Sequence, residues 1–121
     1  MKQTLGFTLS VLAAALLLSV FYSGAAASAA APAKLDGKAI FLAQKCNLCH
    51  SVSSAGIERT MKSEKVAGPD LTNTAAKEDA AKLAKFLRKE DALNGKKHGK
   101  AFTGSDEELG ALISWLQAQK K

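Results

Sequence analysis

Both cysteines of this chain of 121 residues lie in one pentapeptide, Cys46-Asn47-Leu48-Cys49-His50, which also holds one of its two histidines. The order C-x-x-C-H is the attachment signature of c-type haem. Two thiols at this spacing reach the two vinyl groups on one haem edge and form thioethers, and the next residue then lies under the iron. The pentapeptide therefore predicts one covalent haem c on Cys46 and Cys49, with His50 as the proximal iron ligand.

Three other uses of these side chains compete with haem. A thioredoxin-like dithiol expects a strand before the motif and a βαβ context. A zinc site could use Cys46, Cys49, His50 and His98, but the adjacent Cys49 and His50 would have to bind the same tetrahedral ion. A disulfide between Cys46 and Cys49 is the simplest alternative. The complete pentapeptide favours haem over all three.

The N-terminal segment has the pattern of an export signal. Met1-Lys2 is followed by an apolar stretch over residues 5–22 and by small residues over 24–31. A positive start, an apolar middle and an A-x-A end, here Ala27-Ser28-Ala29, describe a secretory signal peptide. We expect residues 1–29 to be removed and residues 30–121 to form the domain, periplasmic or otherwise exported and without a stable membrane span. A retained anchor is the alternative, although the apolar stretch is marginal against the roughly 20 residues that a span needs. Export agrees with haem attachment, which takes place outside the cytoplasm.

The rest of the chain has the pattern of helices joined by loops. Apolar residues recur at helical spacing in three stretches, and no strand-like alternation of useful length is present. Asn94-Gly95 is expected to stop the second helix, and Ser105 with Glu108 forms a capping box for the third. An all-α domain with three main helices is therefore expected. Its expected elements are a helix from the cap Asp36 to Cys46, a loop over 51–74, a helix over 75–93, a basic loop over 96–104, and a final helix after Ser105.

With the pentapeptide placed, residues 36–119 resemble the class I monohaem cytochrome c family. Gly37 and Phe41 match the G-x-x-x-F of the helix that precedes the motif, and Gly68-Pro69-Asp70-Leu71 is similar to the family's G-P-x-L. Residues 102–109 through Trp115-Leu116 look like its C-terminal helix. The resemblance implies three main helices and loops around one haem, a Pro69 carbonyl that holds the His50 ring, and a first helix that crosses the last. The contact at that crossing would involve Gly37, Phe41, Leu112 and Trp115.

The sixth iron ligand departs from the family pattern. The family usually has a Met three residues before the Phe that matches Phe102, and this chain has Gly99 there. The neighbouring His98 lies in the same loop and has a suitable imidazole. Met61, between the pentapeptide and Gly68, would need a rearranged loop. We expect His98 as the distal ligand, ahead of Met61, while water, a Lys or an open site remains possible.

The resemblance implies an electron carrier rather than an enzyme, working as a monomer with redox partner proteins. A haem enzyme or gas sensor with an open or displaceable sixth site is the alternative, which Gly99 supports. The net charge of +6 includes the cluster Lys96, Lys97 and Lys100, which would steer an acidic partner or serve only as a solvated surface. Nucleic acid is not expected, because the chain has an export signal and lacks a binding motif.

Overall fold

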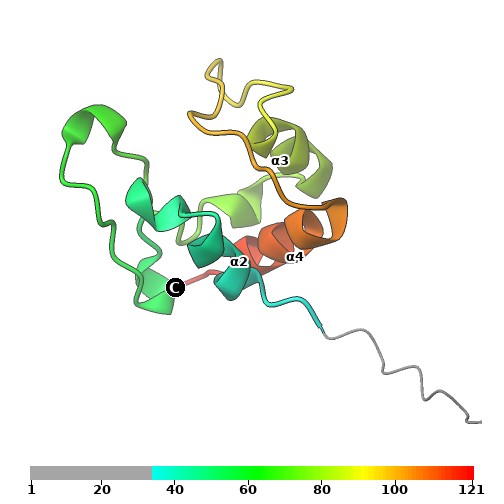
Figure 1. Ribbon diagram of the computed structural model, residues 1–121, viewed down its shortest axis with the longest axis horizontal. Helices are drawn as coiled ribbons and strands as arrows, with labels where there is room; N and C mark the ends of the chain where they lie inside the picture. The colour runs from blue at the N-terminus through cyan, green and yellow to red at the C-terminus, as the bar shows by residue number, and fades with distance from the viewer. Residues whose placement is uncertain (1–33) are drawn as a thin grey trace, which may run out of the picture. The chain divides into compact units, whose positions relative to one another are not determined.

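The computed structural model describes residues 34–121, which contain three α-helices and four short 3-10 turns joined by loops (Figure 1). No strand occurs within this part, and its only β pairings are the isolated bridges Val52–Ile57 and Leu93–Lys96. The all-α prediction is therefore confirmed. The predicted signal peptide and its cleavage site lie outside the described residues. The elements are α2 (Gly37–Ala43), η1 (Cys46–Leu48), η2 (Ser53–Ala55), η3 (Glu64–Val66), η4 (Ala75–Lys77), α3 (Ala80–Leu87) and α4 (Asp106–Gln117).

Helix α2 begins where the sequence predicts and ends earlier. The Asp36 carboxylate caps its start by accepting a hydrogen bond from the Lys38 amide at 2.9 Å. The helix ends at Ala43 because Lys45 takes a left-handed backbone conformation with φ of 57°. The expected continuation to Cys46 is therefore wrong, and the first cysteine begins the separate turn η1 instead.

Helix α4 confirms the predicted capping box. The Glu108 amide donates to the Ser105 hydroxyl at 3.1 Å, and the Ser105 amide donates back to the Glu108 carboxylate at 2.8 Å. Acidic residues fill the first turn, where the helix dipole favours negative charge. The apolar face that follows is buried and consists of Leu109, Leu112, Ile113 and Leu116.

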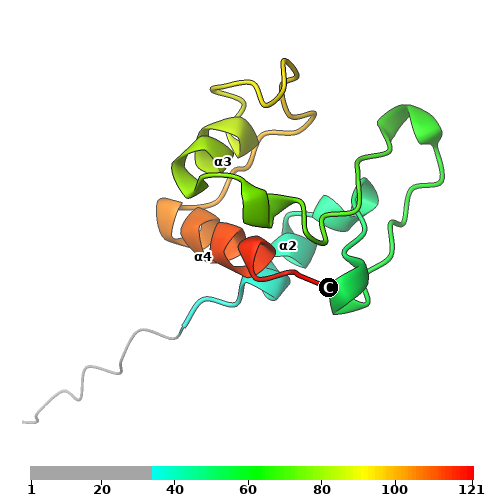
Figure 2. The same cartoon turned by 180° about the vertical axis from the view of Figure 1, so that it is seen from behind.

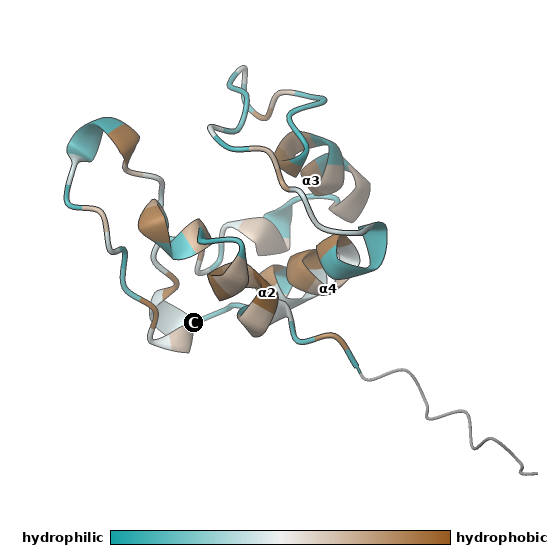
Figure 3. Ribbon diagram, in the orientation of Figure 1, coloured by the Kyte–Doolittle hydropathy of each residue, from teal (hydrophilic) through white to brown (hydrophobic). Residues whose placement is uncertain are grey.

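Helices α2 and α4 cross in close contact, and both views show them side by side (Figures 1 and 2). The Phe41 and Trp115 rings are 5.4 Å apart at an angle of 50°. Gly37 lies so near α4 that a Cβ there would be 2.3 Å from the Trp115 Cβ. The expected contact is therefore confirmed for these three residues. Hydrophobic residues of both helices meet at this crossing (Figure 3), and Leu112 belongs to the same buried cluster.

The predicted helix over 75–93 is wrong in its extent. The Asp79 carboxylate accepts a hydrogen bond from the Lys82 amide at 3.0 Å and so starts a new helix, α3, after the separate turn η4. Lys89, with φ of 63°, follows its end. Asn94-Gly95 does not stop a helix, because both residues have positive φ and form the tight turn between Leu93 and Lys96.

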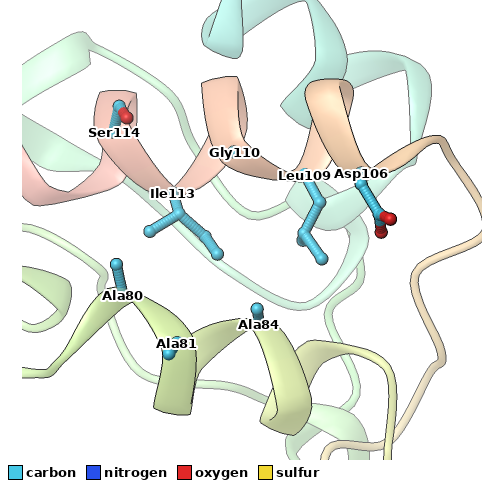
Figure 4. A pocket seen from close by; sticks show the side chains of 8 residues that line it. All are labelled: Ala80, Ala81, Ala84, Asp106, Leu109, Gly110, Ile113 and Ser114. Carbon is cyan, nitrogen blue, oxygen red and sulfur yellow. The ribbon is translucent and has the colours of Figure 1, made fainter.

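Helix α3 packs on α4 through small side chains. Ala80 and Ala84 face Ile113 and Leu109 across the interface, and the small residues leave an apolar hollow there (Figure 4). Within residues 34–121, none of the helices is both long enough and apolar enough to cross a membrane.

Candidate haem site

The Cys46–His50 pentapeptide folds into a single tight turn. The amides of Cys49 and His50 both donate to the Cys46 carbonyl, at 3.2 and 3.0 Å. The two cysteines are half-buried and form no disulfide. Burial raises the pKa of the Cys46 thiol, while the positive charge of Lys100 opposes this rise. A thiol with a raised pKa is a poor nucleophile at neutral pH, which weighs against the dithiol-exchange alternative.

Gly68 and Pro69 contact the His50 ring and fix its orientation. Its Nδ1 lies 2.8 Å from the Pro69 carbonyl oxygen. Because a carbonyl only accepts, Nδ1 carries the hydrogen and Nε2 keeps a free lone pair. Burial lowers the pKa of His50, which favours the neutral imidazole that a metal requires. Gly68 lies against the ring, and a Cβ there would be 2.2 Å from the His50 Cε1.

A clasp around Asp70 fixes the segment that carries Pro69. Its carboxylate accepts hydrogen bonds from the Ser53 hydroxyl, from the Ser53 amide at 3.1 Å, from the Thr72 amide at 2.8 Å and from the Ser51 hydroxyl at 2.8 Å. These bonds, that from the Ser53 hydroxyl above all, hold the pKa of Asp70 well below its usual range. The clasp joins the residues just after His50 to those just after Pro69, so it keeps the Pro69 carbonyl in place.

The structure brings His98 opposite His50. The two ring centroids are 6.0 Å apart and the ring planes differ by 8°. The His98 Nδ1 lies 2.5 Å from the Lys100 carbonyl oxygen, so its Nε2 also keeps a free lone pair. Phe86 of α3 packs edge-on against the ring, with centroids 5.2 Å apart. Both histidines thus have the hydrogen-bond arrangement typical of metal-binding imidazoles.

The distance between these rings suits one metal ion between them. A metal bound by two imidazoles at about 2 Å each separates the two nitrogens by about 4 Å. When the two nitrogens face each other, the ring centroids are further apart by two ring radii, about 6 Å in all, and the observed separation of the centroids is 6.0 Å. With two free thiols on the turn beside His50, the residues present fit a covalent haem.

Met61 lies elsewhere. It belongs to the segment 58–67, which both views show apart from the segment 89–101 that carries His98 (Figures 1 and 2). The Met61 amide donates to the Leu48 carbonyl at 3.1 Å, and 38% of the residue is exposed. The backbone of Met61 is thus tied to the turn η1 and not to the loop that carries His98. Gly99 lies in the loop with His98, and its carbonyl accepts a long hydrogen bond of 3.4 Å from the Lys89 ammonium.

The zinc alternative finds no support in the geometry. Nowhere in residues 34–121 do three or more His, Cys, Asp or Glu side chains gather as a metal-binding group. The pair that does form, His50 and His98, joins one residue of the pentapeptide to one of the basic loop over residues 96–104, named the distal loop from here on.

The sequence does not reveal three residues that contact His98 or its loop. Phe86 lies within the predicted helix over 75–93, and nothing in that pattern indicates its contact with His98. The sequence places Lys100 in a cluster of charged residues and does not indicate that its ammonium donates to the Gln44 carbonyl, at 2.9 Å. Nothing in the sequence marks Gln44, because its partners lie far along the chain.

A comparison with protein-family models matches residues 35–120 to the family described as Cytochrome c. Searches of curated proteins and of solved structures gave no significant match.

Proposed function

This chain belongs to the cytochrome c family, and we propose that it carries single electrons between redox partner proteins outside the cytoplasm. When bound, one covalent haem c supplies an iron that gains and loses one electron. The protein's task is to hold that iron in one environment in both oxidation states. Electron transfer needs no substrate pocket and no general base, so the residues that matter are those that attach and orient the group.

The proximal side is formed by the turn Cys46–His50. The Cys46 and Cys49 thiols would hold the haem through two thioethers, and His50 would provide its Nε2 to the iron. The Pro69 carbonyl fixes the ring through Nδ1 at 2.8 Å and increases the basicity of the ligand nitrogen. Gly68 leaves the space that the ring occupies.

The distal ligand is His98, and the paired imidazoles carry this proposal. Two histidines far apart in the sequence lie with near-parallel rings 6.0 Å apart, each with Nδ1 directed to a backbone carbonyl. Met61 has no comparable placement. Two imidazole ligands give a lower reduction potential than one imidazole and one thioether.

The exposed lysines of the distal loop are the proposed contact for an acidic redox partner. Lys96 and Lys97 are exposed beside His98. Positive charge near the site of electron exit raises the rate of association with an acidic protein at low salt. Export by cleavage of residues 1–29 gives the proposed periplasmic or other extracytoplasmic location, and the working form is a monomer.

The test is a redox-resolved absorption spectrum of the holoprotein, its His98→Ala variant and a Met61→Ala control. A pyridine haemochrome first establishes haem c and its stoichiometry of one. We expect the wild type to be low-spin in both states and to lack the weak long-wavelength band of ferric iron bound to methionine sulfur. The His98→Ala variant should become high-spin, and the Met61→Ala variant should match the wild type. Seeing the methionine band, or no change in the His98→Ala spectrum, contradicts His98 ligation. Immediate binding of carbon monoxide by the ferrous wild type favours the alternative, a haem enzyme or gas sensor, to which Gly99 at the family's Met position points.

A further inference from the structure

Lys100 makes two contacts that link His98 of the distal loop to the C-terminal end of α2. Its backbone carbonyl accepts the hydrogen bond from His98 Nδ1 at 2.5 Å. Its ammonium donates to the Gln44 carbonyl at 2.9 Å. One residue therefore joins the distal imidazole to the segment that leads into Cys46.

Gln44 is a favourable place for this attachment. It is the C-cap of α2, where the last carbonyls have no partner within the helix. A positive charge at this end is also favoured by the helix dipole. The Thr103 hydroxyl adds a second tie by donating to the Gln44 side-chain oxygen at 3.3 Å. Lys100 and Thr103 thus fasten the distal loop at one point, two residues before the first cysteine.

The remaining ties of the loop are few. The Phe102 amide donates to the Leu87 carbonyl at 2.8 Å, which fixes the C-terminal end of the loop to α3. The Lys89 ammonium reaches the Gly99 carbonyl only at 3.4 Å. His98 is partly exposed in a segment without regular structure, so it relies on its neighbours to stay opposite His50.

We propose that Lys100 is a positioning residue, which holds His98 on the distal side by tying its loop to Gln44. The inference rests on the proposed His98 ligation. Its consequence is kinetic: without the Lys100 ammonium the loop opens more often, and His98 leaves the iron more often. An added ligand that must wait for His98 to leave then binds faster.

The experiment measures the association rate of carbon monoxide with the ferrous holoprotein by stopped flow. The variants are Lys100→Met, which keeps most of the side-chain length without the charged donor, and Lys100→Arg, which restores a donor. Lys85→Met is the matched control, because Lys85 is an exposed lysine of α3, outside the proposed partner contact, and its loss changes the net charge equally. We expect Lys100→Met to bind about tenfold faster than wild type, the lower end of what a charge-assisted hydrogen bond contributes. Lys100→Arg should recover most of the wild-type rate, and Lys85→Met should stay close to it.

Each outcome separates this inference from the proposed function. If wild type binds carbon monoxide as fast as His98→Ala, the proposed His98 ligation fails and the Lys100 inference fails with it. If His98→Ala is fast while Lys100→Met equals slow wild type, His98 ligation stands and the role of Lys100 is refuted. An equal increase in Lys85→Met and Lys100→Met reveals a charge effect and also overturns the role of Lys100. Should Lys100→Met fail to retain haem, Thr103→Val removes the second tie to Gln44 and is expected to give a smaller increase, while an unchanged rate counts against the attachment.

Discussion

The close crossing of α2 and α4 predicts that replacing Gly37 with alanine destabilises the domain. An alanine Cβ there would lie 2.3 Å from the Trp115 Cβ and 2.5 Å from the Ala111 carbonyl oxygen, whereas carbon atoms in favourable contact are about 3.5–4.0 Å apart. The obstacle includes backbone of α4, which no change of rotamer can move. The helices must therefore separate by about an ångström or more, which disturbs the packing of Phe41 and Leu112, both 1% exposed.

Overpacking of this kind costs about 1–3 kcal/mol, and the backbone clash places Gly37→Ala near 3 kcal/mol. For a domain of this size each kcal/mol lowers the melting temperature by about 4–8 °C, so we expect a fall of about 12–24 °C. The assay is thermal unfolding of the holoprotein followed by far-ultraviolet circular dichroism.

Gly110→Ala is the matched control, because Gly110 lies in α4, the helix that Gly37 contacts. Gly110 is exposed inside α4, and a Cβ there would meet nothing within 4 Å. Replacing a helical glycine with alanine is worth about 0.8–1.0 kcal/mol, so this variant should melt about 3–8 °C higher. The same chemical change thus has opposite effects at two glycines. A Gly37→Ala protein that melts within a few degrees of wild type, beside a stabilised Gly110→Ala, refutes the close crossing.

Three further predictions concern the proximal side and a helix cap. Gly68→Ala places a methyl group 2.2 Å from the His50 Cε1, so the ferric spectrum should gain high-spin features that the wild type lacks. Asp70→Asn should lower the free energy of unfolding at neutral pH by about 1–2 kcal/mol, after discounting for partial exposure. Because folding lowers the pKa of Asp70, its contribution is complete above the unfolded pKa of about 4 and is lost as pH falls toward the folded value, so denaturant titrations of the two proteins should converge in acid. Ser105→Ala removes the hydroxyl that caps α4 and should cost about 1 kcal/mol, which Ser105→Asp should recover.

The sequence was most informative where a short motif determines local structure. Asp36 and Ser105 start their helices as predicted, because a capping side chain bonds to an amide two or three residues away. The helix over 75–93 failed for a related reason. Apolar spacing continued through that stretch, but the Asp79 carboxylate caps α3 and interrupts the pattern. The periodicity of apolar residues alone could not distinguish one long helix from a short turn followed by a separately capped helix.

The candidate site divides in the same way. The pentapeptide and Gly68-Pro69 could be put forward as candidates from spacing and resemblance, and His98 from the scarcity of ligands. The contacts of the His98 ring and of its loop could not be predicted. Phe86 and Gln44 contact the distal loop because α3 and α2 both pack on α4. That arrangement depends on residues far apart in the sequence, so no local pattern predicts it.

The hydrogen bonds of the two histidines have a consequence for sequence change. Both acceptors, at Pro69 and Lys100, are backbone carbonyls, which every amino acid provides. Point substitutions at these two positions therefore leave an acceptor for each imidazole. Inserting or deleting one residue between His98 and Lys100, or between His50 and Pro69, moves the carbonyl away from its ring. These two hydrogen bonds, unlike the proposed tie from the Lys100 ammonium to Gln44, should thus tolerate a change of side chain at Pro69 or Lys100 and be sensitive to a change in loop length.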